Sequence, residues 1–316
     1  MTANLRATSA TQEELIAYLK QHRIWNAETL LWQWLTARPM PSNEILQTIQ
    51  QLKTWLDAFR PLPPVVVSEL RQRYRVRFTY HSNALEGNTL TQSETELVLT
   101  TGITIGGKTL QEHLEAVGHA DAIAYIEALA QQSMPLGEWE IRQIHSLILR
   151  KIDPEEAGRY RTLDVQAAGT GYVYPPHYLL SELMTEFVTW LNSADAQRLH
   201  PVRYAAEAHH RFVTLHPFRD GNGRTGRLWM NLLLLRAGYP IAIISNENRQ
   251  RYIEALIQGQ QSDHWEPLYT LIMDATQTAL VEVLGVLATA GEIENKELPF
   301  YGEMLKFLQQ QEFLDS

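Results

Sequence analysis

Apolar residues recur at three- and four-residue spacing along nearly the whole chain, and this spacing predicts amphipathic helices rather than strands. Residues 12–59 predict two or three helices, in which the tryptophans are packing anchors: Trp25, Trp32, Trp34 and Trp55. Further helices are expected over residues 66–84, 91–100, 109–131, 137–150, 177–193, 198–215, 222–237, 246–260 and 264–288. The predicted fold class is all-α.

One segment has the spacing of strands instead. Residues 165–176 alternate apolar and polar side chains around the turn Gly169, Thr170 and Gly171, and two prolines end the segment. This pattern predicts a short β-hairpin that includes Val165 and Val173. An isolated hairpin is barely stable alone, so it needs a packing partner or a function. A purely structural hairpin is the alternative.

The proline-rich residues 60–64 break the helical pattern and indicate a boundary. We expect an N-terminal helical element over residues 1–60, a main domain over residues 61–290 and a C-terminal tail over residues 291–316. No repeat or low-complexity segment interrupts this division.

Composition narrows the function classes. The 316 residues are 45% apolar and 20% charged, which is ample for one large core. The absence of cysteine excludes disulfides and thiol catalysis and fits a reducing compartment. The net charge of −9 opposes a general nucleic-acid role, because binding the phosphate backbone needs a basic face. With no signal-peptide pattern, and with the longest apolar run interrupted by charge and proline, we expect a cytoplasmic protein without a membrane role.

The densest chemistry lies at residues 216–227, His-Pro-Phe-Arg-Asp-Gly-Asn-Gly-Arg-Thr-Gly-Arg, which run into an apolar helix. Gly221 and Gly223 allow backbone N–H groups to face an anion, and the start of the helix adds the positive end of its dipole. Arg224 and Arg227 are three residues apart, so they share one helix face and both can bind phosphate oxygens. The segment therefore predicts a polyphosphate site.

Two more side chains in this segment suit reaction chemistry. His216 is the group whose ordinary pKa fits proton abstraction near neutrality. Asp220 offers a hard oxygen ligand of the kind that Mg²⁺ prefers. The alternative for the whole segment is an ordinary surface turn followed by solvated arginines.

Three other patterns lose their functional interpretation in context. Residues 102–109 fit the phosphate-loop pattern Gly-x4-Gly-Lys-Thr, but no alternating strands and helices surround them, so we expect a connector between two helices. Residues 221–226 fit Gly-x-Gly-x-x-Gly, but they follow a helix rather than a strand. The histidines form no recognised zinc spacing, so we place no zinc.

Residues 216–227 resemble, position for position, the signature of the Fic family, His-Pro-Phe-x-(Asp/Glu)-Gly-Asn-Gly-Arg-x-x-Arg. The flanking helices are similar as well, and the resemblance covers residues 61–288. It implies a Fic-type helical core, with residues 61–290 as the Fic domain. The implied activity is transfer of AMP from ATP to a Ser, Thr or Tyr hydroxyl of a target protein, with Mg²⁺ or Mn²⁺ as cofactor.

The resemblance also implies a role for each residue of the motif. His216 would be the base that deprotonates the target hydroxyl, and Asp220 would hold the metal between the α- and β-phosphates. The remaining positions would form the anion hole and bind the outer phosphates: Gly221, Asn222, Gly223, Arg224 and Arg227.

An upstream segment resembles the family's inhibitory pattern, (Ser/Thr)-x-x-x-Glu-(Gly/Asn), at Ser82, Glu86 and Gly87. The resemblance implies an inhibitory helix N-terminal to the core, in which Glu86 pairs with Arg227 and draws it away from the γ-phosphate. The alternative is a solvated glutamate followed by a helix-capping glycine. In some relatives the same glutamate positions water to remove AMP, and the sequence does not separate the two directions.

The hairpin corresponds, by resemblance, to the family's flap, which binds the backbone of the target as an added strand. Tyr252 falls where family members place an aromatic ring against adenine, and a core tyrosine is the alternative. Other transfers at the same site, of UMP, phosphocholine or phosphate, are alternatives to AMP transfer. A nucleotide-binding module without turnover is the alternative to an enzyme. The target protein stays unidentified and a homodimer is left open.

Overall fold

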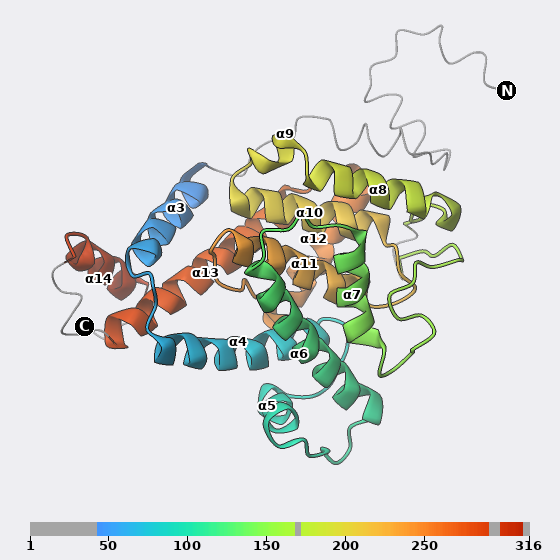
Figure 1. Ribbon diagram of the computed structural model, residues 1–316, viewed down its shortest axis with the longest axis horizontal. Coiled ribbons are helices and arrows are strands. Elements are labelled where there is room, and N and C mark those ends of the chain that lie inside the picture. The colour runs from blue at the N-terminus through green and yellow to red at the C-terminus, as the bar shows by residue number, and fades with distance from the viewer. Residues whose placement is uncertain (1–42, 168–171, 291–297, 312–316) are drawn as a thin grey trace, which may run out of the picture.

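The structure is a computed structural model that describes residues 43–167, 172–290 and 298–311. Within these ranges it contains helices and no β-strand, which confirms the all-α class (Figure 1). In chain order the helices are α3 Asn43–Ala58, α4 Pro64–Ala84, α5 Gln92–Thr101, α6 Leu110–Ala130, α7 Glu138–Leu149, η1 His177–Leu179, α8 Leu180–Leu191, α9 Ala194–Gln197, α10 Pro201–Leu215, α11 Asn222–Arg236, η2 Asn246–Asn248, α12 Arg249–Ser262, α13 Glu266–Ala290 and α14 Tyr301–Gln310.

The predicted helices match these elements closely, with differences at their starts. The helix expected over 198–215 begins at Pro201, because proline lacks an N–H and is favoured in the first turn, where no donor is needed. The helices expected from 177 and from 246 each open with a single 3₁₀ turn. In the predicted tail, the described residues contain α14, which is a helix of ten residues.

The segment predicted as a hairpin is described only in part. Gln166 and Val173 form an isolated antiparallel bridge, and the Ala167 N–H donates to the Tyr172 carbonyl at 2.9 Å. The turn residues Gly169, Thr170 and Gly171 lie outside the described residues. A regular hairpin therefore stays a prediction.

The connector at residues 102–109 has the structure expected for a link between helices. The preceding segment is α5, which is capped at its C-terminal end by Gly102 in the left-handed conformation with φ 69°. The connector closes on Thr109, whose side chain caps α6 in a reciprocal pair with Glu112. The Lys108 ammonium donates to the Thr89 carbonyl and so is used locally. The phosphate-loop interpretation is wrong, because a helix stands where that motif needs a strand.

α10 and α11 form the centre of the molecule (Figure 1). α10 packs against α11, α8 and α13, while α11 packs against α6 and α7. The turn between α10 and α11 holds residues 216–221, so the predicted polyphosphate segment connects two largely buried helices. A single apolar core runs from α3 to α14, and a small separate cluster of Leu90, Val98 and Ala116 supports α5.

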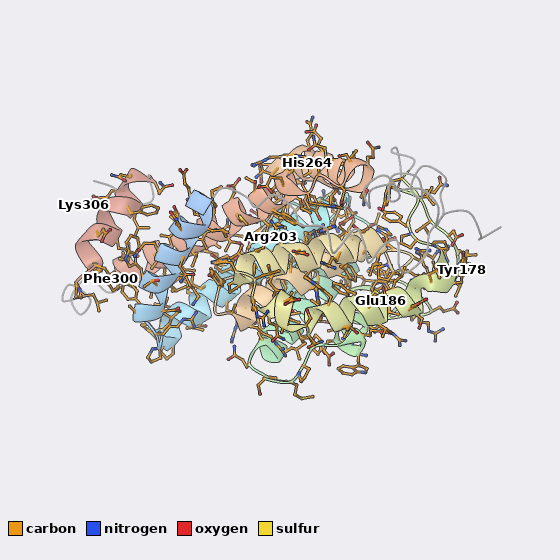
Figure 2. The ribbon with its side chains drawn as sticks, turned by 90° about the horizontal axis from the view of Figure 1, so that it is seen from above. Tyr178, Glu186, Arg203, His264, Phe300 and Lys306 are labelled. Atoms are coloured by element: carbon orange, nitrogen blue, oxygen red, sulfur yellow. The ribbon has the colours of Figure 1, made fainter. Side chains whose placement is uncertain are left out.

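α3, α14 and the C-terminal part of α13 lie at one end of the molecule (Figures 1 and 2). Trp55 stacks on Phe300 with ring centroids 6.3 Å apart and meets Phe307 edge-on at 5.9 Å, as expected for a packing anchor. Phe300 and Lys306 lie at this end, opposite Tyr178, which precedes α8 (Figure 2). Trp25, Trp32 and Trp34 lie outside the described residues. The boundaries at residues 60 and 290 stay predictions.

α13 is the one helix among the described residues that is long and apolar enough to cross a bilayer. Its most apolar window is 67% buried inside the protein. A central core helix has the same composition, so its apolar character is explained by packing against α3, α10 and α12.

Candidate functional site

The site begins where α10 ends. His216 follows the last residue of α10 in the left-handed conformation, with φ 48° and ψ 57°, and its N–H still donates to the Phe212 carbonyl at 3.0 Å. This conformation reverses the chain toward α11, which starts six residues later at Asn222. The imidazole and the first turn of α11 are therefore brought to the same place.

Asn222 holds this turn in shape. Its Oδ1 accepts a hydrogen bond from the Phe218 N–H at 2.9 Å, and its Nδ2 donates to the Phe218 carbonyl at 2.8 Å. The side chain predicted for an anion hole is thus committed to the backbone. Gly221 occupies the N-cap of α11 with φ 73° and has no side chain to cap the helix. The first N–H groups of α11 therefore remain available to an anion.

Arg224 lies beneath this turn with only 2% of its surface exposed. One guanidinium nitrogen donates to Asp220 Oδ2 at 3.2 Å, and another lies 3.7 Å from Glu115 Oε1. Its Nε and Nη1 have no hydrogen-bond partner. Because a buried donor without a partner costs free energy, this guanidinium is suited to an anionic ligand that would supply the missing acceptors.

Arg227 is also buried, and it is bound to the end of α4. Its Nε donates to Ser82 Oγ at 3.0 Å, while its Nη2 donates to the Ser82 carbonyl and to Glu86 Oε1, both at 2.7 Å. Burial acts to lower the pKa of Arg227, but the charges of Glu86 and Tyr252 and the hydrogen bonds to these two side chains together outweigh it and leave the pKa raised. The predicted Glu86–Arg227 ion pair is thus present, across 141 residues of sequence.

Glu86 also lies over the first turn of α11. A Cβ built on Gly223 would overlap Glu86 Oε1, so the carboxylate sits directly above this glycine. Burial acts to raise the pKa of Glu86, but Arg227 and then Arg224 reverse this effect and lower it, so the group is a carboxylate at neutral pH. A carboxylate of the protein itself thus lies beside the first turn of α11.

His216 is enclosed by an aromatic ring and charged groups. Its imidazole stacks on Tyr174, with ring centroids 3.9 Å apart and an interplanar angle of 19°. Burial, followed by the charge of Arg161, lowers the pKa of His216 to about 4, although Glu86 and Asp220 act in the opposite direction. The imidazole is therefore neutral at pH 7 and able to accept a proton.

Asp220 is the exposed member of the site, with 68% of its side chain accessible. Its Oδ1 accepts from the Gly221 N–H at 2.6 Å and its Oδ2 accepts from Arg224. Among the described residues no group of three or more His, Cys, Asp or Glu side chains is arranged to hold a metal. One accessible carboxylate beside a phosphate site still fits Mg²⁺, which takes most of its ligands from phosphates and water.

Tyr252 lies behind Arg227. The residue is 2% exposed, its ring centroid is 5.9 Å from the guanidinium carbon of Arg227, and its hydroxyl lies 3.0 Å from His209 Nε2. This position fits the alternative interpretation of Tyr252 as a core tyrosine, because an adenine ring could reach it only by displacing buried groups. A contact with adenine stays a prediction.

Arg161 binds residues 216–221, which we call the motif turn, to the segment that precedes α8. Its Nε donates to the His216 carbonyl at 2.9 Å, and its other nitrogens donate to the carbonyls of Leu163 and Pro175. Its own N–H donates to the Pro217 carbonyl at 2.9 Å. One buried guanidinium thus fixes the backbone of His216 and the backbone on both sides of the predicted flap. Within the flap, Val165 and Val173 are half-buried.

Several residues of this site were given no role in it from the sequence: Glu115, His145, Arg161 and Tyr174. His145 stands on α7 in register with Ile141 and Ile148, so its helical spacing marked it only as a buried residue. Glu115 and Tyr174 lie far from the motif in sequence. Only the fold brings them to it, and periodicity carries no signal for such contacts.

The match to known proteins agrees with this geometry. The Fic/DOC family model matches residues 135–234, which include α7, α10 and most of α11. The protein adenylyltransferase Fic of Drosophila persimilis is 36% identical over 276 residues, which cover 82% of this chain and 54% of that protein. The chain therefore spans about half the length of the curated relatives it matches.

Two solved structures extend the match to the fold. A Fic domain containing signaling protein from Bacteroides thetaiotaomicron is 32% identical with a TM-score of 0.70, and the alignment covers 77% of this chain and 97% of that one. Fic-1 from C. elegans is 28% identical with a TM-score of 0.72, covering 89% and 83% of the two chains. The arrangement of helices is thus shared over most of the described residues.

Proposed function

The chain belongs to the Fic family, and we propose that it is a protein adenylyltransferase, which transfers AMP from ATP to a Ser, Thr or Tyr hydroxyl of a target protein. The observation that carries this proposal is the meeting of three groups at the start of α11. They are the uncapped helix N-terminus, the buried Arg224 with two nitrogens that make no hydrogen bond, and the neutral imidazole of His216. The name of the Drosophila persimilis relative supports the same activity.

The transfer itself asks the protein for positioning and charge neutralisation. The oxygen of the target hydroxyl forms a bond to the α-phosphorus of ATP while the bond from that phosphorus to the bridging oxygen breaks, and pyrophosphate leaves. A ring nitrogen of His216 takes the hydroxyl proton. Arg224 and the N–H groups of α11 stabilise the charge of the phosphates, and Arg227 would join them once it is released from Glu86.

Asp220 is the residue that would hold Mg²⁺ or Mn²⁺. When bound, the ion would neutralise phosphate charge and orient the leaving group. For this role the carboxylate would exchange its contact with Arg224 for the metal, and this exchange would free the guanidinium for phosphate. The exposure of Asp220 suits such an exchange.

Glu86 is proposed to inhibit this reaction. Its carboxylate occupies the two features that a γ-phosphate needs, the guanidinium of Arg227 and the space above Gly223. ATP would have to displace a charge-assisted hydrogen bond that is already formed, so binding in the productive geometry is disfavoured. Ser82 supports the inhibited state by holding Arg227 in place.

The predicted flap is proposed to bind the target. Tyr174 and Pro175, at its C-terminal end, lie against His216 and Arg161, so a target backbone added along residues 165–173 would present its hydroxyl near the imidazole. Tyr178 is 70% exposed just beyond this segment and extends the surface available to a target.

Intact-mass measurement after incubation with ATP and Mg²⁺ tests the function. We expect Glu86→Gly to gain the mass of one AMP per modified site and the double variant Glu86→Gly, His216→Ala to gain none. An adduct formed only from another nucleotide would indicate a different transferred group. If Glu86→Gly binds ATP tightly but stays unmodified, both alone and with a cell lysate, the protein is a binding module and the proposal fails.

A further inference from the structure

His145, on α7, connects two chain segments that are far apart in sequence. It has no exposed surface. The Gly158 N–H donates to its Nδ1 at 2.9 Å, and its Nε2 lies 3.0 Å from the Asp220 carbonyl oxygen. A backbone N–H can only donate, so Nδ1 is the acceptor and the ring proton is on Nε2. His145 therefore donates to Asp220 as a neutral imidazole with a defined tautomer.

The ring also supports the motif turn from below. It stacks on Phe218 with centroids 3.7 Å apart and an interplanar angle of 2°. A Cβ built on Gly221 would lie 3.4 Å from the Cδ2 and Nε2 atoms of the imidazole, which is close contact. The side chain of His145 thus contacts Phe218, Asp220 and Gly221.

Gly158 gives His145 a fixed support on its other side. Its carbonyl accepts from Arg142 Nε at 2.7 Å, and its φ of +71° suits glycine. A Cβ there would lie 2.9 Å from the Arg142 carbonyl oxygen, so the backbone is closely packed on α7. The imidazole of His145 therefore connects the closely packed backbone at Gly158 to the residues that begin α11.

The hydrogen bond to Asp220 fixes more than one atom. The peptide between Asp220 and Gly221 is planar and trans, so holding its carbonyl on one side directs its N–H to the other. That N–H donates to Asp220 Oδ1 at 2.6 Å and so orients the carboxylate. One hydrogen bond from His145 Nε2 thereby fixes the orientation of the Asp220 carboxylate, which is the proposed metal ligand, and of Gly221, which is the N-cap of α11.

We propose that His145 is a positioning residue, which holds the Asp220–Gly221 peptide in the orientation that binds magnesium and triphosphate. This role rests on the proposed function, because it needs a nucleotide at α11. His145 itself does not touch the reacting atoms. The alternative is a purely structural residue that stabilises the packing of α7 on Phe218.

Two amide substitutions separate these roles. In His145→Gln the side-chain NH₂ is placed near the position of Nε2 and can still donate to Asp220. In His145→Asn the amide oxygen is placed near Nδ1 and can accept from Gly158, but it cannot reach Asp220. Both variants lose the stack on Phe218, so a purely structural role predicts equal effects. We would make both changes in the Glu86→Gly background and measure the affinity for ATP with Mg²⁺, the Mg²⁺ dependence and the melting temperature.

We expect His145→Asn to weaken ATP·Mg²⁺ binding and to raise the Mg²⁺ requirement by about tenfold or more, as for other groups that orient a metal ligand. His145→Gln is expected to stay within about threefold of the parent, although both melting temperatures fall alike. Equal affinities in the two variants would overturn the proposal. If His145→Asn does not fold, His145→Gln decides alone, and a tenfold loss in it would overturn the proposal. If the Glu86→Gly parent binds no ATP, the proposed function fails and this role with it.

Discussion

The carboxylate of Glu86 occupies the space above Gly223, where a Cβ on the glycine would overlap Oε1. The same oxygen accepts a hydrogen bond from Arg227 at 2.7 Å. One side chain thus covers both Gly223, in the first turn of α11, and the guanidinium of Arg227, four residues further along the helix. In the proposed function, a nucleotide phosphate bound at this point would be repelled by the charge of Glu86 and would need the space that the carboxylate fills.

Removal of this carboxylate is expected to strengthen nucleotide binding. Glu86→Gln removes the charge and keeps the size, whereas Glu86→Gly removes both, so the affinity for ATP·Mg²⁺ should rise in the order wild type, Gln, Gly. A gain of about tenfold for Gly corresponds to about 1.4 kcal/mol. Isothermal titration calorimetry measures it. The matched control is Glu127→Gln, which breaks a surface pair with Arg71 away from the site.

The order of these affinities tests whether Glu86 competes with the phosphates of ATP. Equal affinities for wild type and Glu86→Gly would show that Glu86 does not compete with phosphate. A change in Glu127→Gln of the same size would mean that net charge, rather than position, controls binding.

Arg161 is expected to affect turnover more than ATP binding. A lysine at this position has one ammonium and cannot reach the carbonyls of His216, Leu163 and Pro175 together. In the Glu86→Gly background we expect Arg161→Lys to lower the rate of AMP incorporation by on the order of ten- to a hundredfold through misplacement of His216. The affinity for ATP should stay within about twofold.

Arg159→Lys is the control for this variant, because Arg159 is exposed and lies two residues away. A loss of ATP affinity as large as the loss of rate in Arg161→Lys would contradict the assignment, since it would indicate general damage to the site. Quantitative mass spectrometry over time, together with calorimetry, supplies both values.

Stability is expected to depend on pH through enclosed histidines whose pKa values are lowered by burial, among them His119, His145, His209 and His216. Burial lowers the pKa values of His145, His209 and His216 to about 4 from the ordinary 6.5. The unfolded chain therefore binds protons first as the pH falls, so the stabilisation is complete above pH 6.5 and is lost between pH 6.5 and 4. For His145 and His209, which have no exposed surface, the slope is up to about 1.4 kcal/mol per pH unit each.

Urea unfolding at pH 7, 6 and 5 measures this slope. His209→Gln should reduce the dependence by the share of one histidine, while wild type becomes steadily less stable toward pH 5. A free energy of unfolding that does not change between pH 7 and pH 5 would contradict the prediction.

The helices and the motif were predictable because their signals are local. Apolar spacing gave the helix limits to within a few residues, and His216, Asp220 and the two arginines of the motif are adjacent in sequence. The Glu86–Arg227 pair was also predicted, but only by resemblance, because no local rule joins residues 141 positions apart.

The supporting contacts could not be predicted in this way. Arg161 and His145 act through backbone carbonyls of the motif turn, and a carbonyl has no sequence signature. For Tyr252 the sequence allows two different positions. Its aromatic ring suits an adenine contact as well as a core position, and only the fold places it behind Arg227 with its hydroxyl on His209.

Two helical glycines give a final prediction about packing. A Cβ on Gly118 in α6 would lie 2.8 Å from the Ile148 carbonyl oxygen and 2.9 Å from that of Leu147. Backbone cannot move aside as a side chain can, so Gly118→Ala should force α6 away from α7 and cost about 1–3 kcal/mol. Gly302 in α14 has open space around its Cβ position, so Gly302→Ala should stabilise by up to about 1 kcal/mol through helix propensity. Chemical unfolding of both variants compares these effects, and a destabilised Gly302→Ala with a neutral Gly118→Ala would contradict the packing of these helices.

Because α7 carries His145, Gly118→Ala should also weaken ATP·Mg²⁺ binding in the Glu86→Gly background, whereas Gly302→Ala should leave it unchanged.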